Sequence, residues 1–305
     1  MTSPQSHTSH LLVPRLVGRV WGGDRLRALA PEGAPSGPIG EAWFGEADER
    51  PGGVLVKLLD VRERLSVQVH PDDALAREIH GDGAIGKHEA WVVLEAVADA
   101  ELLLGGNPAI PPTEIADALA SGSDLAPLLA HHAVRRGDVF DVPTGCLHAL
   151  MPGLVIWEVQ QRSDRTYRVA DWGRNDPSRP LHTAEAIRAT DAAHRATRTT
   201  AIDWQLPGEQ SLIASPHFTA RAVVGPWAGQ VAIGGQGGTA TATGPVVADG
   251  VQLSSFDTAH LAPGQVSVQV DAGATLLIAE GRSPQDSDSL TFPTLSTGAP
   301  EPTRK

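Results

Sequence analysis

The sequence predicts a mainly β protein made of two double-stranded β-helix barrels in tandem, with a small helical insertion in the first barrel and a degenerate second barrel. Short apolar or alternating runs, each typical of a strand, recur between Gly and Pro turns along most of the 305 residues. Several runs in the first half carry side chains of the kinds that bind metals. From about Thr200 to Gly281 the same texture continues, but it contains only His217 and His260 and no cluster of candidate ligands.

Changes in amino-acid composition and residue pattern along the chain set the predicted domain boundaries. The predicted units are 11–175 (metal-binding barrel, with the insertion at about 111–133), 176–200 (helical connector), 201–281 (second barrel) and 282–305 (disordered tail). The insertion has apolar residues at helical spacing, and the His131-His132 pair is expected at its solvated end. The connector is expected to form a helix over Leu181 to Arg198. The tail is rich in Ser, Pro, Thr and Asp, a composition that buries too little apolar surface to fold.

The individual elements follow from periodicity and turn residues. Predicted strands of the first barrel include 20–23, 41–45, 54–60, 91–95, 100–104, 139–142 and 154–160, and those of the second lie within 217–224, 229–235, 251–259, 265–270 and 274–281. A short helix is expected from Asp72 to His80, with Asp72 or Asp73 as its N-terminal cap.

Composition excludes several classes of function. The net charge of -12 disfavours nucleic acid and anionic membranes as partners, because both would be repelled. No apolar stretch reaches the roughly 18 residues that a membrane-spanning helix needs, and the N-terminus lacks the apolar core of a signal peptide. Cys146 is the only cysteine, which excludes an internal disulfide and fits a reducing compartment. We therefore expect a cytoplasmic protein, a monomer or weak homo-oligomer, that acts on a small molecule.

Two predicted strands offer polar residues to one cavity. Gln68 and His70 are two apart and alternate with the inward-facing Val67 and Val69, so both polar side chains point to the same face. Lys87 and Glu89 are again two apart, before another apolar run. If Lys87 and Glu89 only formed an ion pair at the surface, that pair would stabilise the folded protein by about 0–1 kcal/mol. Stability therefore gives little reason for placing the two residues together.

A later segment completes the candidate site. A Gly-containing turn precedes His148, an apolar strand carries Glu158, and Arg168 follows. Gln68, His70, Glu89 and His148 would supply two nitrogen and two oxygen ligands to a borderline divalent ion. Taken singly, each histidine could be a satisfied polar residue at a strand end, and Gln is an uncommon ligand; the interpretation as a metal site depends on the set of four.

At this point the residues indicate a family. The strings LSVQVHPDD, GKHEAW, PTGCLHAL and EVQQRSDRTYRVADWGR, with VWGG, GEAW and VKLLD before them, resemble segments of type I mannose-6-phosphate isomerases in their short bacterial form. The resemblance covers roughly residues 15 to 175 and is weak over the second barrel. Two departures are Cys146 in place of a usual Thr and Val92 in place of a common Tyr, and both bear on fine substrate preference.

The resemblance implies a cupin enzyme with one Zn²⁺ per chain that interconverts mannose 6-phosphate and fructose 6-phosphate. It implies Gln68, His70, Glu89 and His148 as metal ligands, Lys87 and Arg168 as active-site cations, and Glu158 as an acidic residue near the sugar. Isomerisation through an enediol moves a proton between the first two carbons while negative charge builds on the sugar oxygens, which a metal and cations stabilise.

Several of the candidate site residues have more than one possible role. Glu158 is the candidate base or proton shuttle, although a His or Lys could serve instead. Arg168 and Ser66 are candidate phosphate contacts; the rival for Arg168 is a structural ion pair with Asp164 or Asp171. Cys146 is interpreted as a packing residue. Rival functions are an isomerase of a related sugar, an epimerase or oxygenase with the same pocket, and a non-catalytic sugar-phosphate sensor that keeps the metal.

Overall fold

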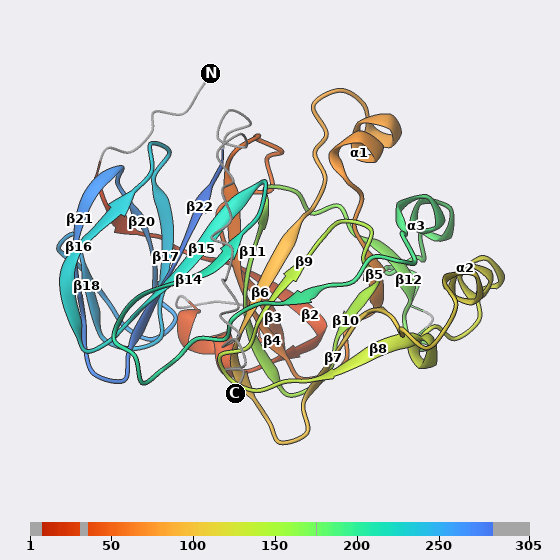
Figure 1. The fold of residues 1–305 in the computed structure, drawn as a ribbon, viewed down its shortest axis with the longest axis horizontal. Helices are drawn as coiled ribbons and strands as arrows, with labels where there is room; N and C mark the ends of the chain where they lie inside the picture. Colours follow the sequence, from red (N-terminus) through yellow and green to blue (C-terminus); the bar gives the residue numbers. More distant parts are fainter. Residues whose placement is uncertain (1–7, 31–35, 175, 283–305) are drawn as a thin grey trace, which may run out of the picture.

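The computed structural model describes residues 8–30, 36–174 and 176–282, and it is mainly β, as predicted. Figure 1 shows two β units side by side, with the three α-helices of the described chain gathered on the outer side of the first unit. None of the helices in these described ranges is long and apolar enough to cross a membrane.

The first unit consists of two antiparallel sheets that face each other. The seven-stranded sheet has the order β13 (Thr197–Arg198), β9 (Val139–Val142), β6 (Glu89–Ala96), β11 (Leu154–Gln161), β4 (Val54–Val61), β2 (Arg15–Gly23) and β3 (Ile39–Phe44), where β3 also pairs with β4. The five-stranded sheet has the order β12 (Tyr167–Ala170), β5 (Val67–Val69), β10 (His148–Leu150), β7 (Glu101–Gly106) and β8 (Leu129–Ala133).

The second unit repeats this two-sheet plan. Its six-stranded sheet has the order β1 (His10–Leu11), β20 (Thr258–Leu261), β17 (Gly238–Ala242), β22 (Thr275–Gly281), β15 (Phe218–Val224) and β14 (Gly208–Ala214). Its four-stranded sheet has the order β16 (Trp227–Ile233), β21 (Gly264–Val270), β18 (Val246–Ala248) and β19 (Val251–Leu253). The first described strand, β1, pairs with β20 and so belongs to the second unit, although the strands that follow it build the first.

The centre of the seven-stranded sheet, at β6, β11 and β4, is buried on both faces, and the alternation of side chains gives the two faces different surroundings. On β11, Val155, Trp157 and Val159 point into an apolar core shared with the second unit, where they meet Phe218 and Leu277. The intervening side chains point into the first barrel. A sheet covered on both sides explains why β11 is buried along its whole length.

Helix α1 (Asp73–His80) agrees with the sequence prediction, including its cap. The Asp72 carboxylate accepts a hydrogen bond from the Leu75 backbone N–H at 2.7 Å, which satisfies one of the free donors at the helix start. Helix α2 (Pro112–Ser121) and two short 3₁₀ helices, η1 (Arg25–Leu29) and η2 (Ala126–Leu128), complete the helical elements apart from α3.

Two helical predictions were wrong in extent. The connector helix expected over Leu181 to Arg198 is only α3 (Thr183–Ala189), because Thr190 is extended and Thr197–Arg198 leave to pair with β9. The His131-His132 pair does not end a helix; it lies in β8 and pairs with β7. In both segments pairing with a distant strand overrides local helical composition. Of the tail expected at 282–305, all but Arg282 lies outside the described residues.

A buried polar contact joins the two units. The Trp157 indole N–H donates to the Thr241 hydroxyl at 3.0 Å, and the Thr241 and Thr258 hydroxyls are 2.9 Å apart. All three side chains are fully buried. This hydrogen bond links β11 of the first unit to β17 of the second.

Thr241→Val is expected to lower the free energy of unfolding by about 1–3 kcal/mol, because the isosteric change leaves the Trp157 N–H buried without an acceptor. Urea unfolding measures the difference. Thr239→Val is the matched control: Thr239 is half-buried on the same face of β17, and its hydroxyl bonds to no described residue, so it should change stability by less than about 0.5 kcal/mol. Equal stability of Thr241→Val and the wild type would contradict the assigned bond.

Candidate metal centre

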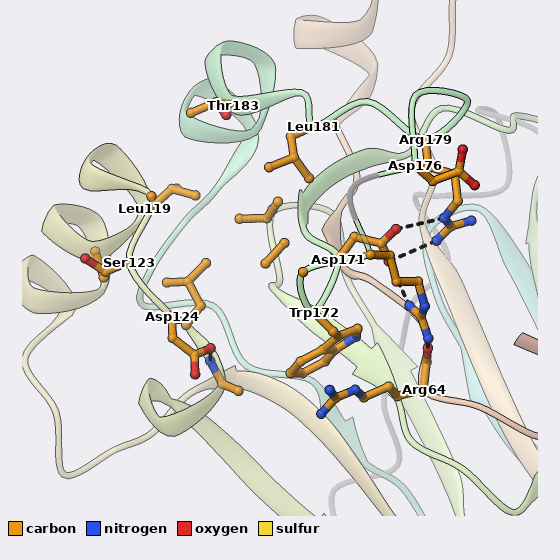
Figure 2. Close-up of a pocket in the computed structure, with 18 of the residues that line it drawn as sticks. Arg64, Leu119, Ser123, Asp124, Asp171, Trp172, Asp176, Arg179, Leu181 and Thr183 are labelled. Carbon is orange, nitrogen blue, oxygen red and sulfur yellow. Dashed lines mark hydrogen bonds and ion pairs between the residues drawn. The ribbon is translucent and has the colours of Figure 1, made fainter. Parts of the chain in front are cut away.

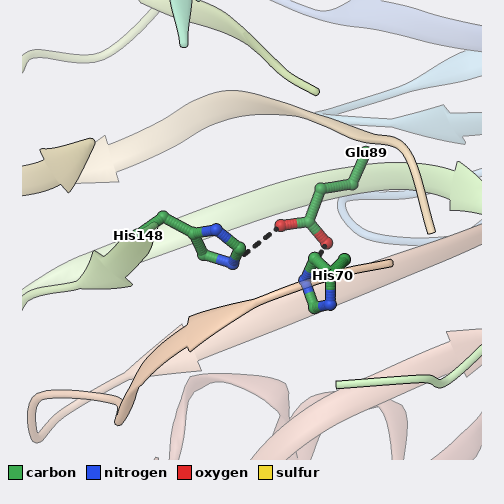
Figure 3. Close-up of side chains that lie close together, drawn as sticks. All are labelled: His70, Glu89 and His148. Atoms are coloured by element: carbon green, nitrogen blue, oxygen red, sulfur yellow. Dashed lines mark ion pairs between the residues drawn. The ribbon is translucent and has the colours of Figure 1, made fainter. Parts of the chain in front are cut away.

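Three of the residues nominated from the sequence meet at the floor of the first barrel. His70 follows β5, Glu89 begins β6 and His148 begins β10, so both sheets contribute. The turn before His148 contains Gly145 at φ +81°, a backbone conformation that glycine adopts without strain. One candidate ligand atom from each of the three lies within 4.8 Å of the others, and Figure 3 shows the side chains pointing toward one another.

The two histidines are held in the orientation that metal binding needs. His70 Nδ1 lies 2.9 Å from the Arg165 carbonyl and His148 Nδ1 lies 2.9 Å from the Cys146 carbonyl, so each Nδ1 carries the proton and donates it. The two Nε2 atoms therefore carry lone pairs and lie 3.4 Å and 3.3 Å from the Glu89 carboxylate, and Lys87 Nζ is 3.2 Å from His70 Nε2. His148 Nε2 and Glu89 Oε1 are buried without any hydrogen-bond partner in the described chain. A cation between them would satisfy both atoms.

The protonation states also suit a cation. Burial, and then the charge of Lys87, lowers the pKa of His70 to about 4, and burial lowers the pKa of His148 as well. Burial alone would raise the pKa of Glu89, but Lys87 and the two histidines together hold it well below its usual value. Neutral imidazoles and an ionised carboxylate are the forms that coordinate a metal.

Gln68, the fourth nominated ligand, stands next to this cluster. It is the direct cross-strand partner of His148 on one side and of Arg168 on the other, so all three side chains share one face of the five-stranded sheet. Its side chain is half-buried and lines the cavity above the cluster.

That cavity, inside the first barrel, has a volume of about 240 Å³. Its lining is mostly polar and charged, and it includes the nominated Ser66, Gln68, Lys87, Glu158 and Arg168. The further lining residues are Arg19, Trp21, Glu41, Trp43, Lys57, Leu59, Leu65, Leu150, Asp164, Thr166 and Arg179. Every residue nominated from the sequence thus lies in this cavity or in the cluster at its floor.

Glu158 sits in a buried charge network beside the cluster. Its Oε1 is 3.2 Å from Lys57 Nζ and 3.9 Å from Lys87 Nζ, and its Oε2 accepts a hydrogen bond from the Trp91 indole at 3.1 Å. Lys87 also pairs with Glu89. Burial opposes the charged form of Lys87, but Glu158 and Glu89 outweigh it and raise the pKa of Lys87. The network is buried, with each of its charges compensated.

Sequence reasoning missed several cavity residues. Lys57 stands opposite Glu158 in the β4–β11 register, and its ammonium lies 4.3 Å from the centre of the Trp43 ring. Glu41 accepts hydrogen bonds from Trp43 at 2.9 Å and from Arg19 at 2.8 Å. The available signal was a charged residue inside an apolar strand, as in VLVKLLDV and IGEAWF, since a buried charge requires a partner.

The other nominated residues also have defined places. Arg168 makes no ion pair with Asp164 or Asp171; its Nη1 donates to the Pro180 carbonyl at 2.9 Å. Ser66 is buried in the cavity wall. Cys146 packs in the barrel core, where burial raises the pKa of its thiol to about 12, as expected of an inert packing residue.

A second, larger hollow of about 870 Å³ lies outside the barrel between α2, α3 and the end of β12. Figure 2 shows Trp172 with Arg64 beside it, and the Asp171 carboxylate bonded to Arg179. None of the three residues of the metal cluster lines this hollow. It is therefore separate from the chemistry at the barrel floor, although Arg179 lines both hollows.

Relatives found by comparison with known proteins carry the name mannose-6-phosphate isomerase. The chain is 37% identical over 218 residues to the probable mannose-6-phosphate isomerase GmuF of Bacillus subtilis (60% of this chain, 68% of the relative). It is 35% identical over 239 residues to the mannose-6-phosphate isomerase of Streptococcus mutans (66% and 74%). No family model matches the chain.

Solved structures agree in fold. A mannose 6-phosphate isomerase from Bacillus subtilis superposes with a TM-score of 0.72 at 25% identity, over 90% of this chain and 99% of that one. A zinc-bound mannose 6-phosphate isomerase superposes with a TM-score of 0.69 at 12% identity, over 90% and 100%. The predicted fold class is confirmed.

The metal-free protein is expected to lose stability as the pH falls from about 6.5 toward 4. The folded His70 has a pKa of about 4, whereas an unfolded histidine titrates near 6.5, so the unfolded state takes up the proton first. The contribution of His70 is present above pH 6.5 and is lost on acidification, by up to roughly 3 kcal/mol.

Urea unfolding in the presence of a chelator, at intervals between pH 7 and 4.5, measures this slope. His70→Gln should flatten it, whereas His131→Gln, which changes an exposed histidine on β8, should keep it. An unchanged slope in His70→Gln would show that His70 does not carry the effect.

Proposed function

This chain belongs to the mannose-6-phosphate isomerase family and is an aldose–ketose isomerase, and we propose that it interconverts mannose 6-phosphate and fructose 6-phosphate with one Zn²⁺ per chain. The observation that carries the mechanism is the cluster of His70, Glu89 and His148, in which His148 Nε2 and Glu89 Oε1 are buried without a hydrogen-bond partner in the described chain. Gln68 and Lys87, which neighbour the cluster, line the charged cavity. We propose Gln68 as the fourth ligand.

The donor set supports zinc. Two imidazole nitrogens and one carboxylate are common ligands of catalytic zinc, which keeps an open position for water or substrate. The zinc-bound neighbour of the same fold adds support. When bound, such an ion would act as a Lewis acid that stabilises negative charge on the sugar oxygens.

We assign proton transfer between the first two sugar carbons to Glu158. It is the cavity carboxylate that Lys87, 3.9 Å away, links to the cluster, it is not a proposed ligand, and Lys57 and Trp91 fix both its oxygens. Lys87 keeps its proton because Glu158 and Glu89 raise its pKa, so it serves as a cation rather than as the base. Ser66 and Arg168 contact the substrate in this proposal.

The cellular setting follows from the same features. The substrate is a small phosphosugar, and the single buried cysteine fits a reducing compartment, so we propose that the enzyme works in the cytoplasm as a monomer or weak homo-oligomer.

Chelation is expected to abolish turnover of mannose 6-phosphate, and added Zn²⁺ is expected to restore it, since the proposed ligands are the only group of three or more candidate metal-binding side chains in the described residues. A coupled assay that detects fructose 6-phosphate measures both steps, and metal analysis should give one zinc per chain. Full activity in chelated, metal-free protein would refute the metal role, and bound zinc without turnover would point to the sensor.

Two substitutions separate metal binding from proton transfer. His148→Ala should lose both zinc and activity, whereas Glu158→Gln should keep zinc but lower kcat by at least about 100-fold, because the amide cannot take up the proton. Glu95→Gln is the control, since Glu95 is a half-exposed carboxylate on β6 outside the cavity. Near wild-type turnover in Glu158→Gln would remove Glu158 from the proton-transfer role.

A further inference from the structure

Three arginines line the same cavity as Lys57 and Lys87. Arg19 comes from β2, Arg168 from β12 and Arg179 from the segment before α3. They belong to different sheets and a loop, so the fold brings them together rather than their sequence spacing.

Two of these arginines are each anchored by a carboxylate on one edge. Arg179 donates from Nε and Nη2 to the two oxygens of Asp171, at 2.8 Å and 3.1 Å. Arg19 donates from Nε and Nη2 to one oxygen of Glu41, at 3.2 Å and 2.8 Å. Both carboxylates are buried. In each guanidinium the Nη1 group makes no hydrogen bond to a described residue, so it remains able to donate.

Arg168 lines the same cavity as Arg19 and Arg179. Its Nε is buried without a hydrogen-bond partner in the described chain. Burial, and then the like charge of Arg179, lowers the pKa of Arg168, and the nearby Asp171 offsets this only in part. An anion bound among the three guanidiniums would offset their mutual repulsion further.

The two lysines of the cavity are ion-paired with Glu158 and Glu89, and Arg19 and Arg179 are ion-paired as well. The difference lies in the donors that remain: each of these two guanidiniums keeps an Nη1 group without a hydrogen bond to a described residue, whereas the single nitrogen of each lysine already faces a carboxylate. An incoming anion would gain less from them than from guanidiniums that keep free donors. Arg also matches the geometry of phosphate oxygens, to which it can donate two parallel bonds.

We propose that Arg19 and Arg179, together with Arg168, bind the phosphate group of the substrate, with Glu41 and Asp171 as positioning residues that aim the guanidiniums. The cavity then has a phosphate end at the arginines and a reacting end at the metal cluster, and a sugar phosphate spans the two. That the ligand is a sugar phosphate rests on the proposed function. That the arginines bind a phosphate dianion does not rest on it.

The test compares Arg179→Ala and Arg19→Ala with Arg174→Ala in the zinc-loaded protein. Arg174 is the matched control, because it also pairs with Asp171, at 2.8 Å, but lines only the outer hollow. Calorimetry first measures the binding of inorganic phosphate. Each cavity variant should weaken the Kd at least about tenfold, the size of one lost charge-assisted hydrogen bond, while Arg174→Ala stays within about twofold.

The second measurement is the ratio of kcat/KM for mannose 6-phosphate to that for mannose. It should fall at least about tenfold in Arg179→Ala and Arg19→Ala, mainly through KM for the phosphorylated sugar. Asp171→Asn, which leaves Arg179 in place but loosens it, should raise the same KM and spare kcat. Far-UV circular dichroism and zinc content confirm that each variant is folded.

The outcomes separate the two proposals. Wild-type phosphate affinity and an unchanged substrate ratio in both cavity variants would overturn the phosphate site while leaving the isomerase intact. A wild type that binds phosphate through these arginines but converts neither sugar would keep the site and reject the isomerase.

Discussion

The seven-stranded sheet is the constraint on which the rest of the structure depends, because it must be apolar on one face and charged on the other. On β11 the residues Val155, Trp157 and Val159 pack against the second unit, while Glu158 between them projects into the cavity. On β6 the same alternation sends Ala90 and Val92 outward and Glu89 inward. A register slip of one residue would exchange these faces and place carboxylates in the apolar core, so the register is strongly specified. The second unit therefore contributes to the site without donating a ligand: it covers the outer face of the sheet that carries Glu89 and Glu158.

Burying so much charge is tolerated because nearly every group has a partner. Lys57, Glu158, Lys87 and Glu89 form a continuous chain of ion pairs, and Glu41 ties Arg19 to Trp43. Three of the exceptions are informative: the His148 Nε2, Glu89 Oε1 and Arg168 Nε atoms are buried and have no hydrogen-bond partner in the described chain. Two of these atoms mark the proposed metal position and the third lies beside the proposed phosphate position. Unsatisfied buried polar atoms carry a cost of about 1–3 kcal/mol each, which a bound cation or anion would remove.

The fold class and the nominated residues could be obtained from the sequence because both depend on local patterns. A period of two places Gln68 and His70 on one face, and turn residues separate the strands. Lys57, Glu41, Arg19 and Arg179 were missed because their roles depend on partners from distant strands, and a charge within an apolar run does not name its partner. The connector helix was too long for a related reason: Thr197–Arg198 pair with β9 across about 55 residues, an interaction that local helical spacing cannot reveal. Strand β1 also pairs with the second unit, which no feature of residues 8–11 signals.

The charge balance at the cavity floor explains how a metal there would be chemically useful. Two ammonium groups, on Lys57 and Lys87, already match two carboxylates, on Glu158 and Glu89. The Glu89 charge is thus compensated before any ion binds, and a dication held by Glu89 would keep nearly its full charge as a net local excess. The excess weakens metal affinity somewhat, because Lys87 repels the ion, but it strengthens the attraction for negative charge that develops on a substrate oxygen. Removing the Lys87 charge would accordingly tighten metal binding while weakening stabilisation of that oxygen, and these opposite effects distinguish an electrostatic role of Lys87 from a merely structural one.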